Sequence, residues 1–180
     1  ASTLNEALLM DYLLKRTNDP KEKMYLLTYY ADQFRTTVFR QTMFAEFEMI
    51  IHEKAEAGES LTPQALCEIY YGLNKKYHGE DMAVDRDIEM EWARIPHFYS
   101  SFYVYKYATG FSAATSFAKQ ILEEGAPAVE RYIGFLKSGG SDYSIEILKR
   151  AGVDMSTPAP IRDAMDVFRS LIEEMEQYAK

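Results

Sequence analysis

Side chains that could bind a peptide or stabilise a negative charge are concentrated around residue 100. His97 follows a proline, and the next ten residues contain Tyr99, Tyr103, Tyr105 and Tyr107. Spacings of four residues predict that Tyr99, Tyr103 and Tyr107 share one face of a helix. Donors aimed at a developing oxyanion stabilise it strongly in a dry site, so a catalytic role is one interpretation. Packing with local hydrogen bonds is the alternative, because buried phenols and imidazoles need partners.

A second candidate begins like a helical zinc motif but does not complete it. His52 and Glu53 are followed three residues later by Glu56, where the metal motif has a second histidine. The charged surroundings favour a solvated helix end over a metal site. Similarly, His78 after two lysines and before a glycine is typical of a helix C-terminus.

Glycines in two places need separate explanations. Gly110 lies in a predicted helix, where it costs about 1 kcal/mol relative to alanine. Close approach of a substrate or of another helix would justify that cost. Gly139 and Gly140 precede Ser141 but lack the lysine and the strand of a phosphate-binding loop. They predict a flexible turn, with Ser141 capping a short helix that extends to Ala151.

The elements that must position these residues are predicted to be helical throughout. Apolar residues recur at helical spacing along nearly the whole chain, and no useful strand alternation is found. Asp19 with Pro20 and Thr62 with Pro63 are typical helix starts. The fold class is therefore all-α, a bundle of long helices. The first expected helix contains the apolar stripe of residues 4–13 and ends near residue 18, and the second runs from residue 20 to Glu56 or Gly58. The others cover residues 63–77, 88–93, 99–123, 127–138, 141–151 and 161–178.

Composition excludes several classes of function. The chain has 180 residues and a formal net charge of −8, which argues against binding nucleic acid. No apolar run approaches the roughly 20 residues needed to span a bilayer. Cys67 is the only cysteine, so no intrachain disulfide can form, and a buried thiol in a cytoplasmic protein is expected. Aromatic residues make up 14% of the chain, enough for a core, a peptide groove or both.

Three motifs in the same order resemble the oligoendopeptidase F family, a group within the thimet-oligopeptidase-like zinc metallopeptidases. They lie at residues 1–9, at residues 95–110 and in two parts at residues 139–143 and 148–154. The resemblance covers essentially the whole chain. It implies a mostly helical metallopeptidase in which an H-E-x-x-H helix and a later glutamate bind zinc.

By this resemblance, His97 hydrogen-bonds the peptide or the tetrahedral intermediate, and Tyr107 donates to its oxyanion. Tyr99, Tyr103, Tyr105 and Gly110 are expected to bind substrate. The H-E-x-x-H helix and the third ligand are absent from this sequence. We therefore expect residues 1–180 to be one all-helical unit, the C-terminal portion of the catalytic domain, inactive alone. The expected partners are an oligopeptide and the missing N-terminal part, with zinc bound by upstream residues.

Two other functions fit the residues. A complete helical scaffold could use the aromatic stripe as a groove for a peptide or partner helix, without catalysis. A self-contained metalloenzyme could use His52, Glu53, Glu56 and His78 as ligands, if the fold brought them together.

Overall fold

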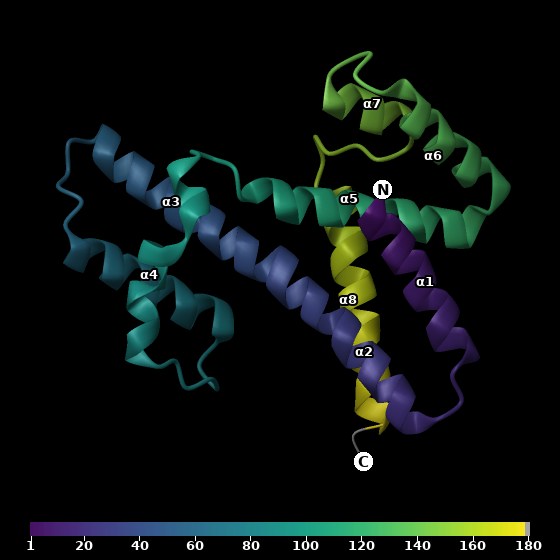
Figure 1. The fold of residues 1–180 in the computed structure, drawn as a ribbon, viewed down its shortest axis with the longest axis horizontal. Coiled ribbons are helices and arrows are strands. Elements are labelled where there is room, and N and C mark those ends of the chain that lie inside the picture. The colour runs from purple at the N-terminus through teal and green to yellow at the C-terminus, as the bar shows by residue number, and fades with distance from the viewer. Residues whose placement is uncertain (179–180) are drawn as a thin grey trace. The chain divides into compact units, whose positions relative to one another are not determined.

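The computed structural model describes residues 1–178, and all regular structure in that range is helical (Figure 1). The all-α prediction is therefore confirmed. None of the helices in this range is long and apolar enough to cross a membrane. The α-helices are α1 (Ser2–Arg16), α2 (Pro20–Phe34), α3 (Arg40–Glu56), α4 (Pro63–His78), α5 (Tyr105–Glu124), α6 (Ala126–Ser138), α7 (Ser144–Arg150) and α8 (Ala159–Tyr178).

The long helix expected over residues 20–56 forms with one irregularity. A π-helical stretch, Arg35–Phe39, joins α2 to α3 without a break. The Asp19 carboxylate accepts a hydrogen bond from the Lys21 N–H at 2.9 Å and so caps α2. Thr62 caps α4 through the Ala65 N–H at 3.2 Å. Local cap signals thus predicted both helix starts correctly.

The helix expected from Tyr99 begins six residues later than predicted. Pro96–Tyr99 forms a short 3₁₀ helix, here called η3, and α5 begins only at Tyr105. Between them Phe102 has φ +55°, in the left-handed region that a bulky residue rarely adopts. A right-handed helix cannot continue through that residue. Consequently Tyr107 lies in the first turn of α5, rather than further along a helix that begins at Tyr99.

The cap predicted at Ser141 is also wrong. Helix α7 has Tyr143 at its N-cap, and the Asp142 carboxylate accepts a hydrogen bond from Arg150 at 2.6 Å. This pairing holds the turn and the end of the helix together, so Ser141 is not needed as a cap. Gly152 follows α7 with φ +100°, as a helix C-terminus favours.

Backbone contacts divide the chain into two compact units. The first comprises Ala1–Arg35 and the chain from Thr109 onward, and the second comprises Thr36–Ala108. That residues 1–180 belong to one catalytic domain of a larger enzyme stays a prediction.

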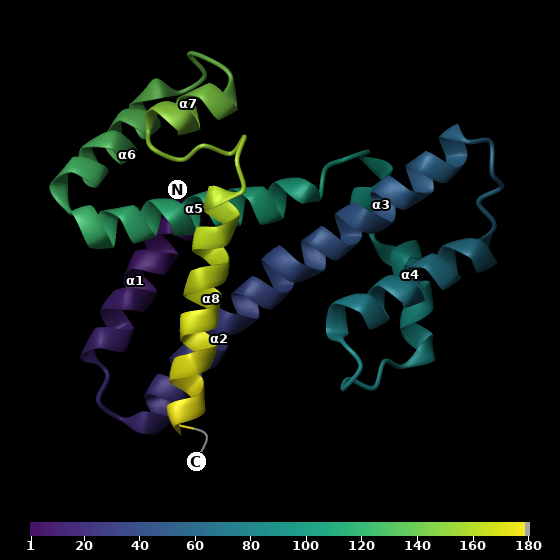
Figure 2. The ribbon, with the colours of Figure 1, turned by 180° about the vertical axis from the view of Figure 1, so that it is seen from behind.

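Within the first unit, α8 lies along α2, and α7 lies beside α6 (Figures 1 and 2). Phe34 is fully buried there, with its ring centroid 4.8 Å from that of Phe111 and 5.4 Å from that of Phe168. These rings from α2, α5 and α8 anchor the three helices to one another. Such a contact set explains why the apolar stripes of these helices face inward.

The second unit packs α3 and α4 against a 3₁₀ helix, Arg86–Arg94, here called η2. Glu91 of η2 is central: its Oε1 lies 2.7 Å from Arg40 Nη2, and its Oε2 accepts a hydrogen bond from the Tyr70 hydroxyl at 2.6 Å. Arg94 also pairs with this carboxylate. Because η2 is tied to both α3 and α4, the segment that follows it, which carries His97, starts from a fixed point.

Candidate functional site

His97, Tyr103 and Tyr107 form a cluster of three rings in the second unit. The His97 ring centroid lies 5.8 Å from that of Tyr103 and 5.9 Å from that of Tyr107. The two tyrosine centroids are 5.7 Å apart in an edge-to-face arrangement. The Tyr107 hydroxyl lies 3.3 Å from His97 Nε2, which accepts the hydrogen bond when the imidazole proton is on Nδ1.

The three-ring cluster can reach a ligand because its members are open to solvent. Tyr103 is 41% and Tyr107 is 37% exposed, and His97 is exposed as well. Hydrogen bonding with Tyr103, together with partial desolvation, raises the pKa of the Tyr107 hydroxyl above its ordinary value. The phenol therefore keeps its proton through the neutral range and remains a hydrogen-bond donor.

The other three predicted site residues have different surroundings. Tyr99 belongs to η3 and is 90% exposed, and Tyr105 starts α5 and is about half exposed. Gly110 lies on α5, and a Cβ added there would meet no atom within 4 Å. The close helix packing that could have explained Gly110 is thus not seen among the described residues. Its role in substrate binding stays a prediction.

Two apolar residues hold the backbone around the three-ring cluster. Phe98, next to His97, packs between Phe44 and Phe47, with ring centroids 5.5 Å and 5.4 Å away. Val104, next to Tyr103, is 1% exposed in the same core. Phe98 packs against this core and Val104 is buried in it, whereas their neighbours His97 and Tyr103 are exposed and point outward.

Sequence reasoning missed Glu48, which supports the same segment from α3. Glu48 is 2% exposed, and its Oε1 accepts a hydrogen bond from the Phe102 N–H at 2.5 Å. A signal was available: Glu48 lies four residues after Phe44 and three before Ile51, on the apolar stripe of α3. A charged residue on a core stripe requires a specific partner.

The residues of the incomplete zinc motif do not assemble a metal site. The His52 ring packs on the Phe102 ring at a centroid distance of 4.6 Å, and Glu53 and Glu56 are exposed. Within residues 1–178, no three His, Cys, Asp or Glu side chains come together as metal ligands. The four residues of the self-contained metalloenzyme alternative are therefore not brought together as a ligand set in this range.

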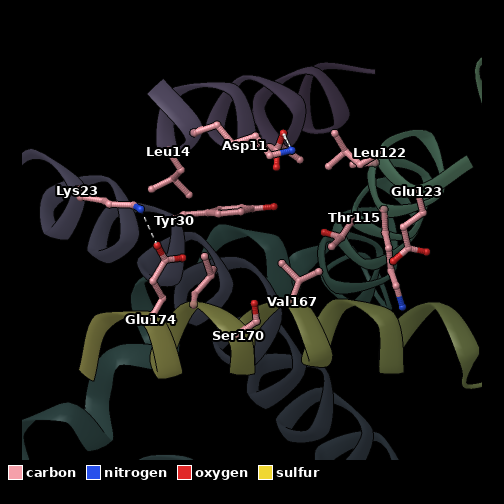
Figure 3. Close-up of a pocket in the computed structure, with 15 residues that line it drawn as sticks. Asp11, Leu14, Lys23, Tyr30, Thr115, Leu122, Glu123, Val167, Ser170 and Glu174 are labelled. Atoms are coloured by element: carbon pink, nitrogen blue, oxygen red, sulfur yellow. Dashed lines mark ion pairs between the residues drawn. The ribbon is translucent and has the colours of Figure 1, made fainter. Parts of the chain in front are cut away.

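The first unit contains a separate, mostly apolar pocket of about 360 Å³ between α1, α2, α5 and α8 (Figure 3). Tyr30 is 7% exposed, and its hydroxyl points into this pocket without a hydrogen-bond partner among residues 1–178 (Figure 3). Burial, with a smaller effect of Asp11, raises the pKa of Tyr30 to about 12. Lysines at the rim are paired with carboxylates, Lys15 with Asp11 and Lys23 with Glu174.

Comparisons with known proteins agree with the resemblance seen in the sequence. The chain is 57% identical over 177 residues to oligopeptidase PepF of Bacillus subtilis, covering 98% of this chain and 26% of that protein. It is 44% identical over 177 residues to the plasmid oligoendopeptidase F of Lactococcus lactis subsp. cremoris, covering 98% of this chain and 30% of that protein. This chain thus spans less than a third of the length of either relative.

A solved structure shares the fold. The crystal structure of oligoendopeptidase-F from Enterococcus faecium matches with a TM-score of 0.95 at 48% sequence identity. The match covers 98% of this chain and 34% of that one. Residues 1–167 also match the sequence model of Peptidase family M3. Since this match extends over most of the sequence, the chain belongs to Peptidase family M3.

Proposed function

We propose that this chain is the substrate-orienting part of a zinc-dependent oligoendopeptidase, and that His97 and Tyr107 contact the scissile carbonyl of the bound peptide. The proposal is supported by the family, by relatives named as oligopeptidases, and by the three-ring cluster. The substrate class is a short peptide. A cytoplasmic location is part of the proposal and is supported by the single cysteine, which is buried and unpaired.

The observation that carries the proposal is the 3.3 Å separation of the Tyr107 hydroxyl and His97 Nε2. Two donor atoms this close can both reach one oxygen atom at ordinary hydrogen-bond distance. The Tyr107 hydroxyl donates in its neutral form, and His97 donates whenever Nε2 carries a proton. When a peptide carbonyl lies beside the pair, hydrogen bonds from these donors strengthen as its oxygen becomes negative. Interactions that are stronger in the transition state than in the bound substrate lower the activation barrier.

Tyr103 supports the pair from the side. Its ring is stacked on His97 at an interplanar angle of 27°, which limits rotation of the imidazole. Its exposed hydroxyl can bond the backbone of a peptide. Tyr99, Tyr105 and Gly110 are the further predicted substrate contacts.

In this proposal, zinc and the general base are held by the part of the enzyme outside these 180 residues. Zinc bound there would polarise the carbonyl and activate water. The remaining chemistry belongs to residues described here. His97 and Tyr107 bind the carbonyl oxygen, and Tyr103 keeps the imidazole oriented.

Cleavage of an internally quenched oligopeptide, measured with zinc content, tests the proposal on the full-length parent protein and on this chain side by side. We expect zinc and chelator-sensitive cleavage in the parent, and neither in the chain. Zinc and cleavage in the chain alone would require ligands among His52, Glu53, Glu56 and His78. Peptide binding without cleavage in the zinc-loaded parent would instead favour the non-catalytic scaffold.

A further inference from the structure

We infer that Glu48 is a positioning residue for the three-ring cluster, acting through the backbone of Phe102. This inference rests on the proposed function, because its consequence is measured in peptide cleavage. The Glu48 carboxylate accepts the Phe102 N–H at 2.5 Å from inside the core, and among residues 1–178 no hydrogen bond or ion pair joins it to the three rings. It therefore acts on the site only through the segment that carries Tyr103.

Phe102 needs such a support because its backbone conformation is unfavourable. With φ +55° it adopts the left-handed region that glycine tolerates and bulky residues avoid. Conformations of this kind persist only where surrounding structure determines them. The Glu48 carboxyl group is buried, so the hydrogen bond from the Phe102 N–H satisfies a polar group that is shielded from water.

A second contact from the same helix holds the side chain of Phe102. His52 lies one turn after Glu48 on α3, and its ring packs on the Phe102 ring with centroids 4.6 Å apart. Phe102 is thus held at two points, the N–H by Glu48 and the ring by His52. This assigns His52 a packing role in place of the metal-binding role that its sequence context first suggested.

Phe102 transmits this support to the three-ring cluster because Tyr103 is the next residue. The Tyr103 ring contacts both His97 and Tyr107, at centroid distances of 5.8 Å and 5.7 Å. If Phe102 relaxes to an ordinary φ, the direction of the following peptide changes and Tyr103 leaves this position. The Tyr107–His97 pair then loses its lateral support, although neither residue has been altered.

The test compares three substitutions on α3 in the full-length enzyme. Glu48→Met fills a similar volume but removes the acceptor, so the core stays packed while the Phe102 N–H loses its partner. Glu48→Gln keeps an acceptor oxygen at the same reach. Glu53→Ala is the matched control, since it removes an exposed carboxylate from the same helix. We expect kcat/KM to fall at least tenfold in Glu48→Met, mainly through kcat, and to stay within about threefold in the other two.

A double-mutant cycle with Tyr107→Phe separates positioning from general destabilisation. If Glu48 acts through the three-ring cluster, Glu48→Met should cost little more than twofold once the Tyr107 hydroxyl is gone. A full tenfold cost in that background, or wild-type kcat/KM in Glu48→Met, would overturn the inference. A more than tenfold loss of kcat/KM in a normally folded Glu48→Gln variant would also overturn the inference. This second variant keeps the test decisive if Glu48→Met fails to fold.

A spectroscopic readout reports the position of Tyr103 directly. Fluorine NMR is recorded on the protein with 3-fluorotyrosine incorporated, and the resonance of Tyr103 is the one that disappears in Tyr103→Phe. We expect it to shift in Glu48→Met and to stay in place in Glu53→Ala, and an unchanged signal in Glu48→Met contradicts the inference. Failure of the proposed function looks different, since the zinc-loaded wild type would then not cleave peptide, or Tyr107→Phe would cleave as well as wild type.

Discussion

The Tyr107 hydroxyl and His97 Nε2 are 3.3 Å apart, although ten residues of chain separate them. This pair is held from two sides, by the first turn of α5 and by the Phe98 side chain, which packs against the core. Its separation limits what each partner can do, because the two groups can either bond each other or share one ligand oxygen.

Removing the Tyr107 hydroxyl should lower kcat much more than it changes KM. Tyr107→Phe keeps the ring contacts with His97 and Tyr103, so the loss is confined to one donor. We expect kcat in the full-length enzyme to fall by about 10²–10³, as for loss of one oxyanion donor. Tyr143→Phe is the control, because this ring lies in the first unit and is 84% exposed. Equal kcat in wild type and Tyr107→Phe would remove Tyr107 from the mechanism.

Replacing His97 by phenylalanine tests the imidazole in the same way. The phenyl ring can still stack on Tyr103, whereas the Nε2 contact with Tyr107 is lost. We expect kcat/KM to fall by about 10²-fold, a typical contribution for a positioned polar group in the transition state. Steady-state kinetics on the quenched peptide measures this. A change in KM alone would indicate that His97 binds the peptide without stabilising the transition state.

Tyr30 should make the stability of the first unit depend on alkaline pH. Its pKa is raised from 10.0 to about 12, so below pH 10 both the folded and the unfolded chain hold the proton. Between pH 10 and 12 the unfolded chain releases the proton while the folded chain keeps it, so the free energy of unfolding falls with rising pH. The loss should be on the order of 1–3 kcal/mol.

Comparison of wild type with Tyr30→Phe isolates that contribution, since phenylalanine has no ionisable proton. At neutral pH the substitution should change stability by less than about 1 kcal/mol, because no described residue bonds the hydroxyl. Above pH 10 the denaturation midpoint of wild type should then fall relative to that of Tyr30→Phe. A difference that stays constant up to pH 12 would contradict the buried, protonated phenol.

Glu91 should stabilise the second unit at neutral pH and lose this effect in acid. Burial alone would raise its pKa, but hydrogen bonds from Arg40 and Tyr70 outweigh burial, and the pKa lies below its ordinary 4.5. The carboxylate therefore contributes stability above pH 4.5, which is lost as pH falls through the lowered pKa. Glu91→Gln should cost about 1–3 kcal/mol at pH 7, because it leaves Arg40 beside an uncharged group.

Urea denaturation of the full-length protein, followed at neutral pH and again near pH 3, measures the Glu91 contribution. We expect the difference in free energy of unfolding between wild type and Glu91→Gln to be smaller near pH 3 than at neutral pH. Glu59→Gln serves for comparison, since its ion pair with Lys54 is exposed on both sides and should contribute less than about 0.5 kcal/mol. An equal loss in the two variants would mean that the Glu91 network adds nothing beyond a surface ion pair.

Local signals made much of the fold predictable. The starts of α2 and α4 follow from Asp19 and Thr62, whose side chains bond the first turn of their own helices. The start of α5 was not predictable in this way, because it depends on Phe102 and on Glu48, which is 54 residues away in sequence. Helical periodicity cannot detect such a contact, so it extended the helix back to Tyr99.

The candidate site shows the same division. His97, Tyr103 and Tyr107 were expected to converge and do so, but through a turn and a loop rather than along one helix face. Glu48 and Tyr30 escaped notice because their importance comes from burial beside a particular partner or space. Only the tertiary structure reveals that one carboxylate lies in a core and that one phenol faces a pocket.

The late start of α5 gives the two tyrosines different mechanical properties. The backbone of Tyr107 is fixed by the hydrogen bonds of α5. The position of Tyr103 depends instead on a short loop, which Glu48 of α3 holds through the Phe102 N–H. A substitution that releases Phe102 would therefore move Tyr103 while the hydrogen bonds of α5 still hold Tyr107. Under the proposed function, a change at Glu48 would alter the position of Tyr103 and leave the backbone of Tyr107 in place, so the two contacts with a peptide could be changed separately.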